Sequence, residues 1–146
     1  MKTVIFDMDG TLADISHRVH HVRRKKKDWR AFHKGIPDDV PNPAIVSLYQ
    51  TLWRSGVYDI QIVTGRNEAH RAATESWLDN HDIPFSHVTM RADNDYRSDT
   101  VMKAEILRRF RDEGKDVLFA VDDRAGVTAM WRENGVTCLQ CAEGNF

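Results

Sequence analysis

VIFDMDGT, which spans residues 4–11, begins with the short apolar run of a fully buried parallel strand. Asp7 and Asp9 come next, two residues apart, and an extended backbone places side chains at this spacing on one face. Gly10 lets the backbone turn, and Thr11 can hydrogen-bond within that turn. Two carboxylates that lie close together repel each other and need a cation or a shared proton. An Asp-Gly turn after an ordinary strand would give the same letters, so the function of this stretch depends on the rest of the chain.

The composition is that of one soluble globular domain. The chain has 146 residues and a mass of 16.8 kDa, with 41% hydrophobic and 29% charged residues. The expected organisation is a single domain over residues 1–146. No apolar run approaches the roughly 18 residues that span a bilayer, and no signal peptide precedes the first predicted strand. We therefore expect a cytoplasmic protein that does not associate with membranes.

Positive charge is concentrated in one segment. Residues 17–34 contain eight lysines and arginines and one acidic residue, for a formal charge of +7, whereas the rest of the chain carries −8. Five of these cations form the run Arg23 to Lys27, with Trp29 and Phe32 close behind it. Such a segment predicts a local site for a polyanion and could guide a nucleic-acid strand by charge and stacking. A solvated loop would explain the same run.

Apolar strands and helical patterns alternate along the chain. Strands are predicted at residues 4–6, 58–63, 87–90, 117–121 and 136–139. The best-marked helix begins at Pro43 and ends at Gly56. Residues 13–41 show no sustained periodicity and are expected to form loops with one short helix near residues 28–34. The alternation predicts an α/β fold, with helices on both faces of a parallel sheet and a ligand site beyond the carboxyl ends of the strands.

Polar side chains gather at those predicted strand ends. They are Asp7 and Asp9 after the first strand, Thr64 and Arg66 after the second, Arg91 after the third, and Asp122 and Asp123 after the fourth. Four carboxylates form an oxygen-rich set that suits Mg²⁺ better than a soft metal. Lys103 is predicted to lie in the first turn of its helix, near the same edge, where it could offset negative charge. A lysine exposed to solvent is the alternative.

Four motifs in this order resemble those of the haloacid dehalogenase superfamily. They are DMDGT after an apolar strand, IVTGR at the end of the second strand, a lysine early in a later helix, and VDD at the end of the fourth strand. The resemblance covers essentially the whole chain. It implies a three-layer Rossmann-like fold and phosphoryl transfer through an aspartyl-phosphate.

The resemblance also implies a role for each matching residue. Asp7 would be the nucleophile, and Asp9 would protonate the leaving group and later take a proton from water. Thr64, the amide of Gly65 and Lys103 would hold the phosphoryl oxygens. Because the acid Asp9 is present, a phosphatase is favoured over a dehalogenase or a mutase.

Mg²⁺ is the cofactor that the resemblance implies. Asp122 would bind it together with Asp7 and the main-chain carbonyl of Asp9. Asp123 would contact the ion either directly or through a neighbouring ligand.

A closer resemblance is to the phosphatase domain of phage-type polynucleotide kinase-phosphatases, which remove 3′-phosphates from nucleic-acid ends. The matching pieces are FDMDGTLA, TGR, DTVMKAEIL, VDDR with VTAMWRENGVTC, and LQCAEGNF. Arg18, Arg66 and Arg91 occupy positions where that family has arginines near the scissile phosphate and the nucleotide. The arginine fork binds two phosphate oxygens at once, which suits this role. The resemblance therefore implies a polynucleotide 3′-phosphatase that acts on DNA or RNA ends.

The short insert supports a large substrate. Many relatives carry a folded cap domain that encloses small substrates, whereas residues 13–41 form a minimal insert and residues 91–98 only a loop. An open site suits a substrate that is large enough to cover it. The family joins the phosphatase to a kinase domain, but the chain has no G-x-x-x-x-G-K-[ST] loop, so we expect no 5′-kinase activity from it. A kinase or ligase domain is a candidate partner.

Two other functions stay open. A small-substrate phosphatase, such as a nucleotidase, would use the same residues, and a nucleic-acid-binding module would keep the basic segment beside a vestigial site. Cys138 and Cys141 form a Cys-x-x-Cys pair, but zinc would need two further ligands, so we expect reduced thiols in a packed strand end. His17, His20 and His21 could bind a metal, although the carboxylates already provide a metal site.

Overall fold

Parallel strands form the centre of the protein. The computed structural model describes residues 1–145 of the chain. Within this range, five parallel strands form one sheet in the order β5-β4-β1-β6-β7. They are β1 (Lys2–Phe6), β4 (Tyr58–Asn67), β5 (Val88–Arg91), β6 (Asp116–Arg124) and β7 (Thr137–Gly144). The chain runs from β1 to one edge of the sheet and then crosses to the other side of β1. An open α/β sheet binds its ligand where the strand order changes direction in this way.

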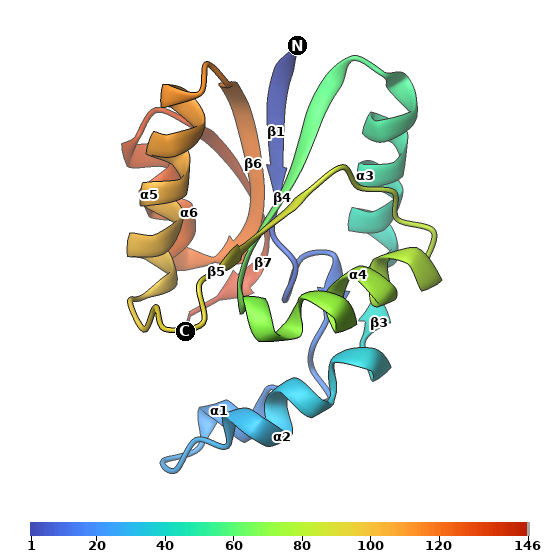
Figure 1. Cartoon of the computed structure of the whole chain (residues 1–146), viewed down its shortest axis with the longest axis vertical. Helices are drawn as coiled ribbons and strands as arrows, with labels where there is room; N and C mark the ends of the chain where they lie inside the picture. Colours follow the sequence, from blue (N-terminus) through green and yellow to red (C-terminus); the bar gives the residue numbers. More distant parts are fainter. Residues whose placement is uncertain (146) are drawn as a thin grey trace.

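Helices cover both faces of the sheet. α3 (Pro43–Ser55) and α4 (Arg71–Asn80) lie on one face, and α5 (Asp99–Asp112) and α6 (Ala125–Glu133) lie on the other (Figure 1). Val4 and Phe6 of β1 point into the core under α3 and α4, while Ile5 points into the core under α5 and α6. The predicted three-layer α/β fold is therefore confirmed. No helix within residues 1–145 is both long and apolar enough to cross a membrane.

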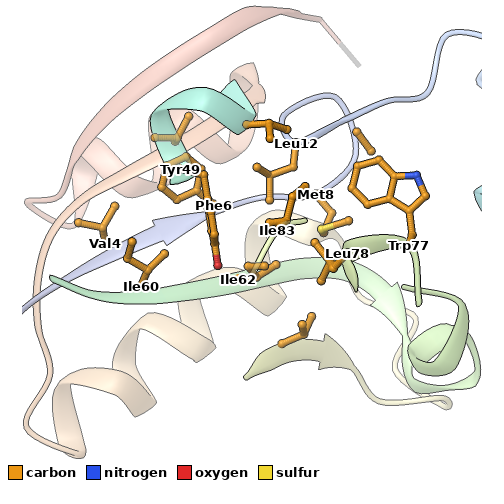
Figure 2. Close-up of a cluster of buried hydrophobic side chains, with 14 of the residues drawn as sticks. Val4, Phe6, Met8, Leu12, Tyr49, Ile60, Ile62, Trp77, Leu78 and Ile83 are labelled. Carbon is orange, nitrogen blue, oxygen red and sulfur yellow. The ribbon is translucent and has the colours of Figure 1, made fainter. Parts of the chain in front are cut away.

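The core under α3 and α4 fixes the loop that follows β1. Phe6 meets the ring of Tyr49 edge-on, with the ring centroids 5.0 Å apart (Figure 2). Met8 and Leu12 come from that loop and are fully buried in the same core. Burial of such a side chain contributes about 1.5–3 kcal/mol. The buried side chains of Phe6, Met8 and Leu12 thus hold this loop, with Asp7 and Asp9, in one position.

The insert between β1 and α3 has more regular structure than predicted. It contains an antiparallel ribbon and three short helical segments, namely β2 (Ala13–Asp14), α1 (His20–Arg23), α2 (Trp29–Lys34), η1 (Ile36–Asp38) and β3 (Val40–Pro41). α2 confirms the helix predicted near residues 28–34, and the Asp28 carboxylate caps it by accepting a hydrogen bond from the Ala31 amide at 3.0 Å. The other elements have two to four residues each, too few for a periodic pattern. The insert lies beneath the carboxyl ends of the strands (Figure 1).

Three strands end several residues later than predicted. β4 continues through Thr64 to Asn67, β6 continues through Asp122 to Arg124, and β7 continues to Gly144. The polar residues of β4 and β6 therefore lie within the strand ends and not beyond them. The pairing of β4 with β5 and of β6 with β7 is irregular in these last residues. Such irregularity is common next to active sites because it redirects side chains and main-chain groups.

Candidate active site

Lys103 joins carboxylates from two strands at the edge where β1 and β6 end. It is the fifth residue of α5, just beyond the predicted first turn, and only 2% of its surface is exposed. Its Nζ donates hydrogen bonds to Asp7 Oδ1 at 2.9 Å and to Asp122 Oδ2 at 3.0 Å. Burial alone would lower the pKa of the lysine, but Asp122 and Asp7 raise it above its ordinary value. Lys103 is therefore a buried cation and not a surface lysine.

Asp7, Asp122 and Asp123 form a buried group that we call the carboxylate cluster. One oxygen from each residue lies within 4.8 Å of the others. Burial raises the pKa of Asp7 well above its ordinary value, and repulsion by Asp122 raises it further. The same two causes raise the pKa of Asp123. Lys103 offsets one of three negative charges, so the cluster keeps an excess of negative charge.

Gly10 lets the loop after β1 pass close to the carboxylate cluster. Its φ is +81°, a left-handed conformation that favours glycine. A Cβ atom at this position would lie 2.1 Å from Asp123 Oδ2. The glycine of VIFDMDGT is therefore needed for the approach of this loop to β6.

The carboxylate cluster fits a hard divalent cation. All of its candidate ligand atoms are carboxylate oxygens, which Mg²⁺ prefers. A cation among them would also relieve the repulsion that raises the pKa values of Asp7 and Asp123. The carboxylate of Asp9 is not part of this cluster. Its contribution through the main-chain carbonyl stays a prediction.

Two buried arginines hold the carboxylate of Asp9. Arg18 donates from Nη2 to Asp9 Oδ1 at 2.8 Å, and Arg66 donates to the same oxygen from Nε at 3.1 Å and from Nη2 at 2.5 Å. Burial would raise the pKa of Asp9, but Arg66 and Arg18 more than offset it and lower this pKa to about 2. Arg18 and Arg66, two of the three arginines predicted near the scissile phosphate and the nucleotide, therefore meet at the predicted acid and base.

Asp39 is a site residue that the sequence did not predict. It joins Asp9, Arg18 and Arg66 in a second group, which we call the arginine cluster. Its buried carboxylate accepts hydrogen bonds from Arg18 Nε at 2.7 Å, Arg18 Nη2 at 2.8 Å and Arg66 Nη2 at 3.2 Å. His17, considered above as a metal ligand, instead contacts Asp39 Oδ1 at 2.7 Å. Charge balance indicates only that two buried arginines need carboxylate partners, and it does not distinguish Asp39 from its neighbour Asp38.

Thr64 and Gly65 lie at the irregular end of β4. The buried Thr64 hydroxyl accepts a hydrogen bond from the Arg66 amide at 3.1 Å. A Cβ atom at Gly65 would lie 2.5 Å from Asp99 Oδ1. Arg91 donates from Nε to the Gly65 carbonyl at 2.9 Å and forms an ion pair with Asp99. Arg91 thus braces the Gly65 segment, and its contact with substrate stays a prediction.

Cys138 and Cys141 are free thiols, as expected. Cys141 lies beside the loop after β1, with Sγ 3.7 Å from Thr11 Oγ1 and 3.8 Å from the Gly10 carbonyl oxygen. Burial raises the pKa of Cys141 to about 11. The thiol is therefore protonated at neutral pH, which makes it a poor nucleophile and a poor metal ligand.

Comparison with known proteins identifies the family. A family model described as the phosphatase domain of polynucleotide kinase PNKP matches residues 1–146. The chain belongs to this family. This match confirms the resemblance that the four sequence motifs indicated. The chain is therefore a phosphatase domain of the haloacid dehalogenase type.

Solved structures agree with the PNKP assignment. A chain in the structure of a Pnkp1/Rnl/Hen1 complex is 30% identical over 99% of this domain, with a TM-score of 0.83. A chain of the Pnkp1/Rnl/Hen1 RNA repair complex is 31% identical over 99%, with a TM-score of 0.81. The domain spans 46% and 43% of those two chains, less than half of each. A haloacid dehalogenase-like hydrolase from Streptococcus pneumoniae, 17% identical over 94% of this domain and 83% of its own chain, has the same fold with a TM-score of 0.67.

Proposed function

We propose that this domain is a Mg²⁺-dependent phosphatase that removes 3′-phosphates from nucleic-acid ends through an aspartyl-phosphate on Asp7. The observation that carries the proposal is the meeting of two charged clusters at VIFDMDGT. Lys103 and the carboxylate cluster lie at Asp7, and the arginine cluster lies at Asp9. A phosphate at Asp7 would therefore have cationic groups from three parts of the chain within reach.

Asp7 and Asp9 divide the chemistry between them. An oxygen of Asp7 attacks phosphorus, the bond from phosphorus to the 3′ oxygen breaks, and Asp9 gives a proton to that oxygen. Asp9 then takes a proton from water, the water oxygen attacks phosphorus, and the Asp7–phosphorus bond breaks to release inorganic phosphate. Asp9 is ionised in the free site. In the proposed reaction it takes up a proton from solvent when the substrate phosphate replaces it as the partner of Arg18 and Arg66.

The other site residues bind the phosphoryl group. We infer that Lys103, the Thr64 hydroxyl and the Gly65 amide hold its oxygens. Mg²⁺ held by Asp7, Asp122 and Asp123 would screen the charge between the phosphate and its nucleophile.

Three observations support a nucleic-acid end as the substrate. The family is that of a polynucleotide kinase, and one related structure is described as an RNA repair complex. The insert adds short helices beneath the strand ends and not a folded cap (Figure 1). It also carries the basic run Arg23 to Lys27. The proposed partners are a kinase or ligase domain and other proteins of RNA repair, with residues 1–146 as one phosphatase domain.

A substrate panel tests the proposal. Phosphate release is measured with Mg²⁺ from 3′-phosphorylated oligonucleotides, 5′-phosphorylated oligonucleotides and free mononucleotides, for the wild type and for Asp7→Asn. We expect kcat/KM to be highest for the 3′-phosphorylated strand by about tenfold or more, equivalent to 1.4 kcal/mol of transition-state binding. Preference for mononucleotides would support a nucleotidase instead. No Asp7-dependent turnover of any substrate would support a binding module.

Mg²⁺ is expected to raise the melting temperature of the wild type. At 100 times its Kd, a bound ion stabilises the folded state by about 2.7 kcal/mol, or roughly 8 °C for a domain of this size. Asp7→Asn removes a ligand from the carboxylate cluster and should lose most of this rise, measured by thermal unfolding in EDTA and in Mg²⁺. The control is Asp112→Asn at the exposed end of α5. Equal rises in all three proteins would place the ion elsewhere.

Neutralising the basic run Arg23 to Lys27 should raise KM for oligonucleotides more than KM for a small aryl phosphate. Cations along a strand contribute by neutralising its phosphates, and a small substrate has no strand to contact. Steady-state kinetics at two salt concentrations measure the effect, which should be smaller at high salt. Equal changes in KM for both substrates would show that the run does not guide a strand.

A further inference from the structure

Three rings form a near-parallel column between the insert and the body of the domain. Trp29 and His33 lie one turn apart on α2, and His70 lies in η2 (Glu68–His70), which follows β4. The Trp29 and His33 ring centroids are 6.0 Å apart with planes 25° apart, and those of His33 and His70 are 4.0 Å apart with planes 26° apart. We call this set the ring column.

The inner end of the ring column lies near the arginine cluster. His70 comes four residues after Arg66, whose guanidinium binds Asp9. Burial and the neighbouring His70 ring lower the pKa of His33 to about 4, and the charges of Asp9, Arg18 and Arg66 also act on it. Burial and the Arg66 charge lower the pKa of His70 too. Both imidazoles are therefore neutral at pH 7 and present uncharged ring faces.

The outer end of the ring column borders the basic run. Trp29 is 52% exposed, and it lines a surface hollow of about 510 Å³ together with Arg24, Lys26, Lys27 and Asp28. The Nζ atom of Lys27 lies 5.7 Å from the Trp29 ring centroid. An exposed indole beside a cationic hollow is the combination with which proteins bind single strands, because bases stack on the ring while cations hold the phosphates.

Trp29 is not the aromatic residue that packs the insert against the body of the domain. Phe32 does so, because its ring is buried and its centroid lies 4.3 Å from the Arg18 guanidinium carbon. The sequence predicts that Phe32 helps to guide a strand, but its burial leaves no free face for a base. Trp29 keeps about half of its surface open while its edge-on contact with Phe32 holds it in place.

We propose that Trp29, backed by His33 and His70, stacks on a nucleobase close to the phosphorylated end of a single strand, whose backbone continues through the hollow at Arg24, Lys26 and Lys27. This inference rests on the proposed function, because it places the terminal phosphate at Asp7. Stacking tolerates any base, so the site selects unpaired ends of several nucleotides without reading their sequence. Mononucleotides lack the strand that would contact the cationic hollow, and in a paired end every base except the last is already stacked on both faces.

The test compares Trp29→Ala with Trp29→Phe in the full chain. The readout is the ratio of kcat/KM for a 3′-phosphorylated single strand to kcat/KM for a small aryl phosphate. We expect Trp29→Ala to lower this ratio about tenfold and Trp29→Phe to restore most of it, because phenylalanine keeps a stacking face. The matched control is Tyr96→Ala, which removes a ring that is 91% exposed outside the column. An unchanged ratio in Trp29→Ala would overturn the inference.

A binding measurement separates this inference from the proposed function. Fluorescence anisotropy of a labelled, unphosphorylated single strand in EDTA requires no phosphatase activity. Weaker binding by Trp29→Ala, by about tenfold, supports the stacking site even if 3′-phosphates are not hydrolysed. Equal binding by Trp29→Ala and the wild type, together with normal hydrolysis of 3′-phosphates, would leave the phosphatase intact and remove the stacking site.

Discussion

Asp9→Asn is expected to slow the release of phosphate from a 3′-phosphorylated strand by about 10²- to 10⁴-fold, the usual contribution of general acid–base catalysis. The sugar hydroxyl is a poor leaving group and needs a proton as its bond to phosphorus breaks. An aryl phosphate has a good leaving group that departs without one. The loss of kcat should therefore be much smaller for the aryl phosphate, which steady-state kinetics on both substrates can measure.

The comparison of leaving groups separates the acid role of Asp9 from its structural role. Asp9 also pairs with Arg18 and Arg66, so its replacement could disturb both arginines. Such a disturbance would slow both substrates alike, and equal losses would therefore contradict the acid role. Asp14→Asn is the control, because Asp14 lies in the same segment with an exposed side chain.

Asp39→Ala is expected to destabilise the domain by about 3–5 kcal/mol, the cost of removing one partner from a buried ion pair. The variant would leave Arg18 and Arg66 buried with Asp9 as their remaining carboxylate partner in the arginine cluster. Chemical unfolding measures the loss, and the melting temperature should fall by about 10 °C or more. Activity should fall as well, because both arginines lose the carboxylate that orients them.

Asp38→Ala provides the matched control for Asp39→Ala. Asp38 precedes Asp39 directly and is exposed at the end of η1. Its replacement should change the free energy of unfolding by no more than about 0.5 kcal/mol. Similar losses in the two variants would mean that the turn, and not the buried ion pairs of Asp39, accounts for the effect.

Three of the four carboxylates that the sequence grouped together, Asp7, Asp122 and Asp123, lie together because the fold places them by a simple rule. The fourth, the carboxylate of Asp9, pairs with Arg18 and Arg66 instead. Parallel strands end at one edge of the sheet, so residues that follow β1 and end β6 must lie close together. That rule requires only the strand positions, and these follow from short apolar runs. Small errors in the strand ends, such as the extension of β6 through Asp122, leave the rule intact because neighbouring strands end together.

The arginine cluster and the ring column could not be predicted in the same way. Asp39 and Arg18 belong to an insert without periodicity, and nothing in the letters separates the buried Asp39 from the exposed Asp38. His33 and His70 come from segments 37 residues apart that meet when the insert folds back beneath the sheet. Contacts of this kind depend on the path of the chain in space, which local propensity does not determine.

Transfer of labelled phosphate from a strand to the enzyme tests the central claim most directly. The domain is mixed with single strands that carry radiolabelled phosphate at the 3′ end or at the 5′ end, quenched with acid within one turnover, and mapped by peptide digestion. We predict label on the peptide that contains Asp7, from the 3′-labelled strand and not from the 5′-labelled strand, and none in Asp7→Asn. Label on another residue, or equal label from both strands, would contradict a 3′-phosphatase that acts through Asp7.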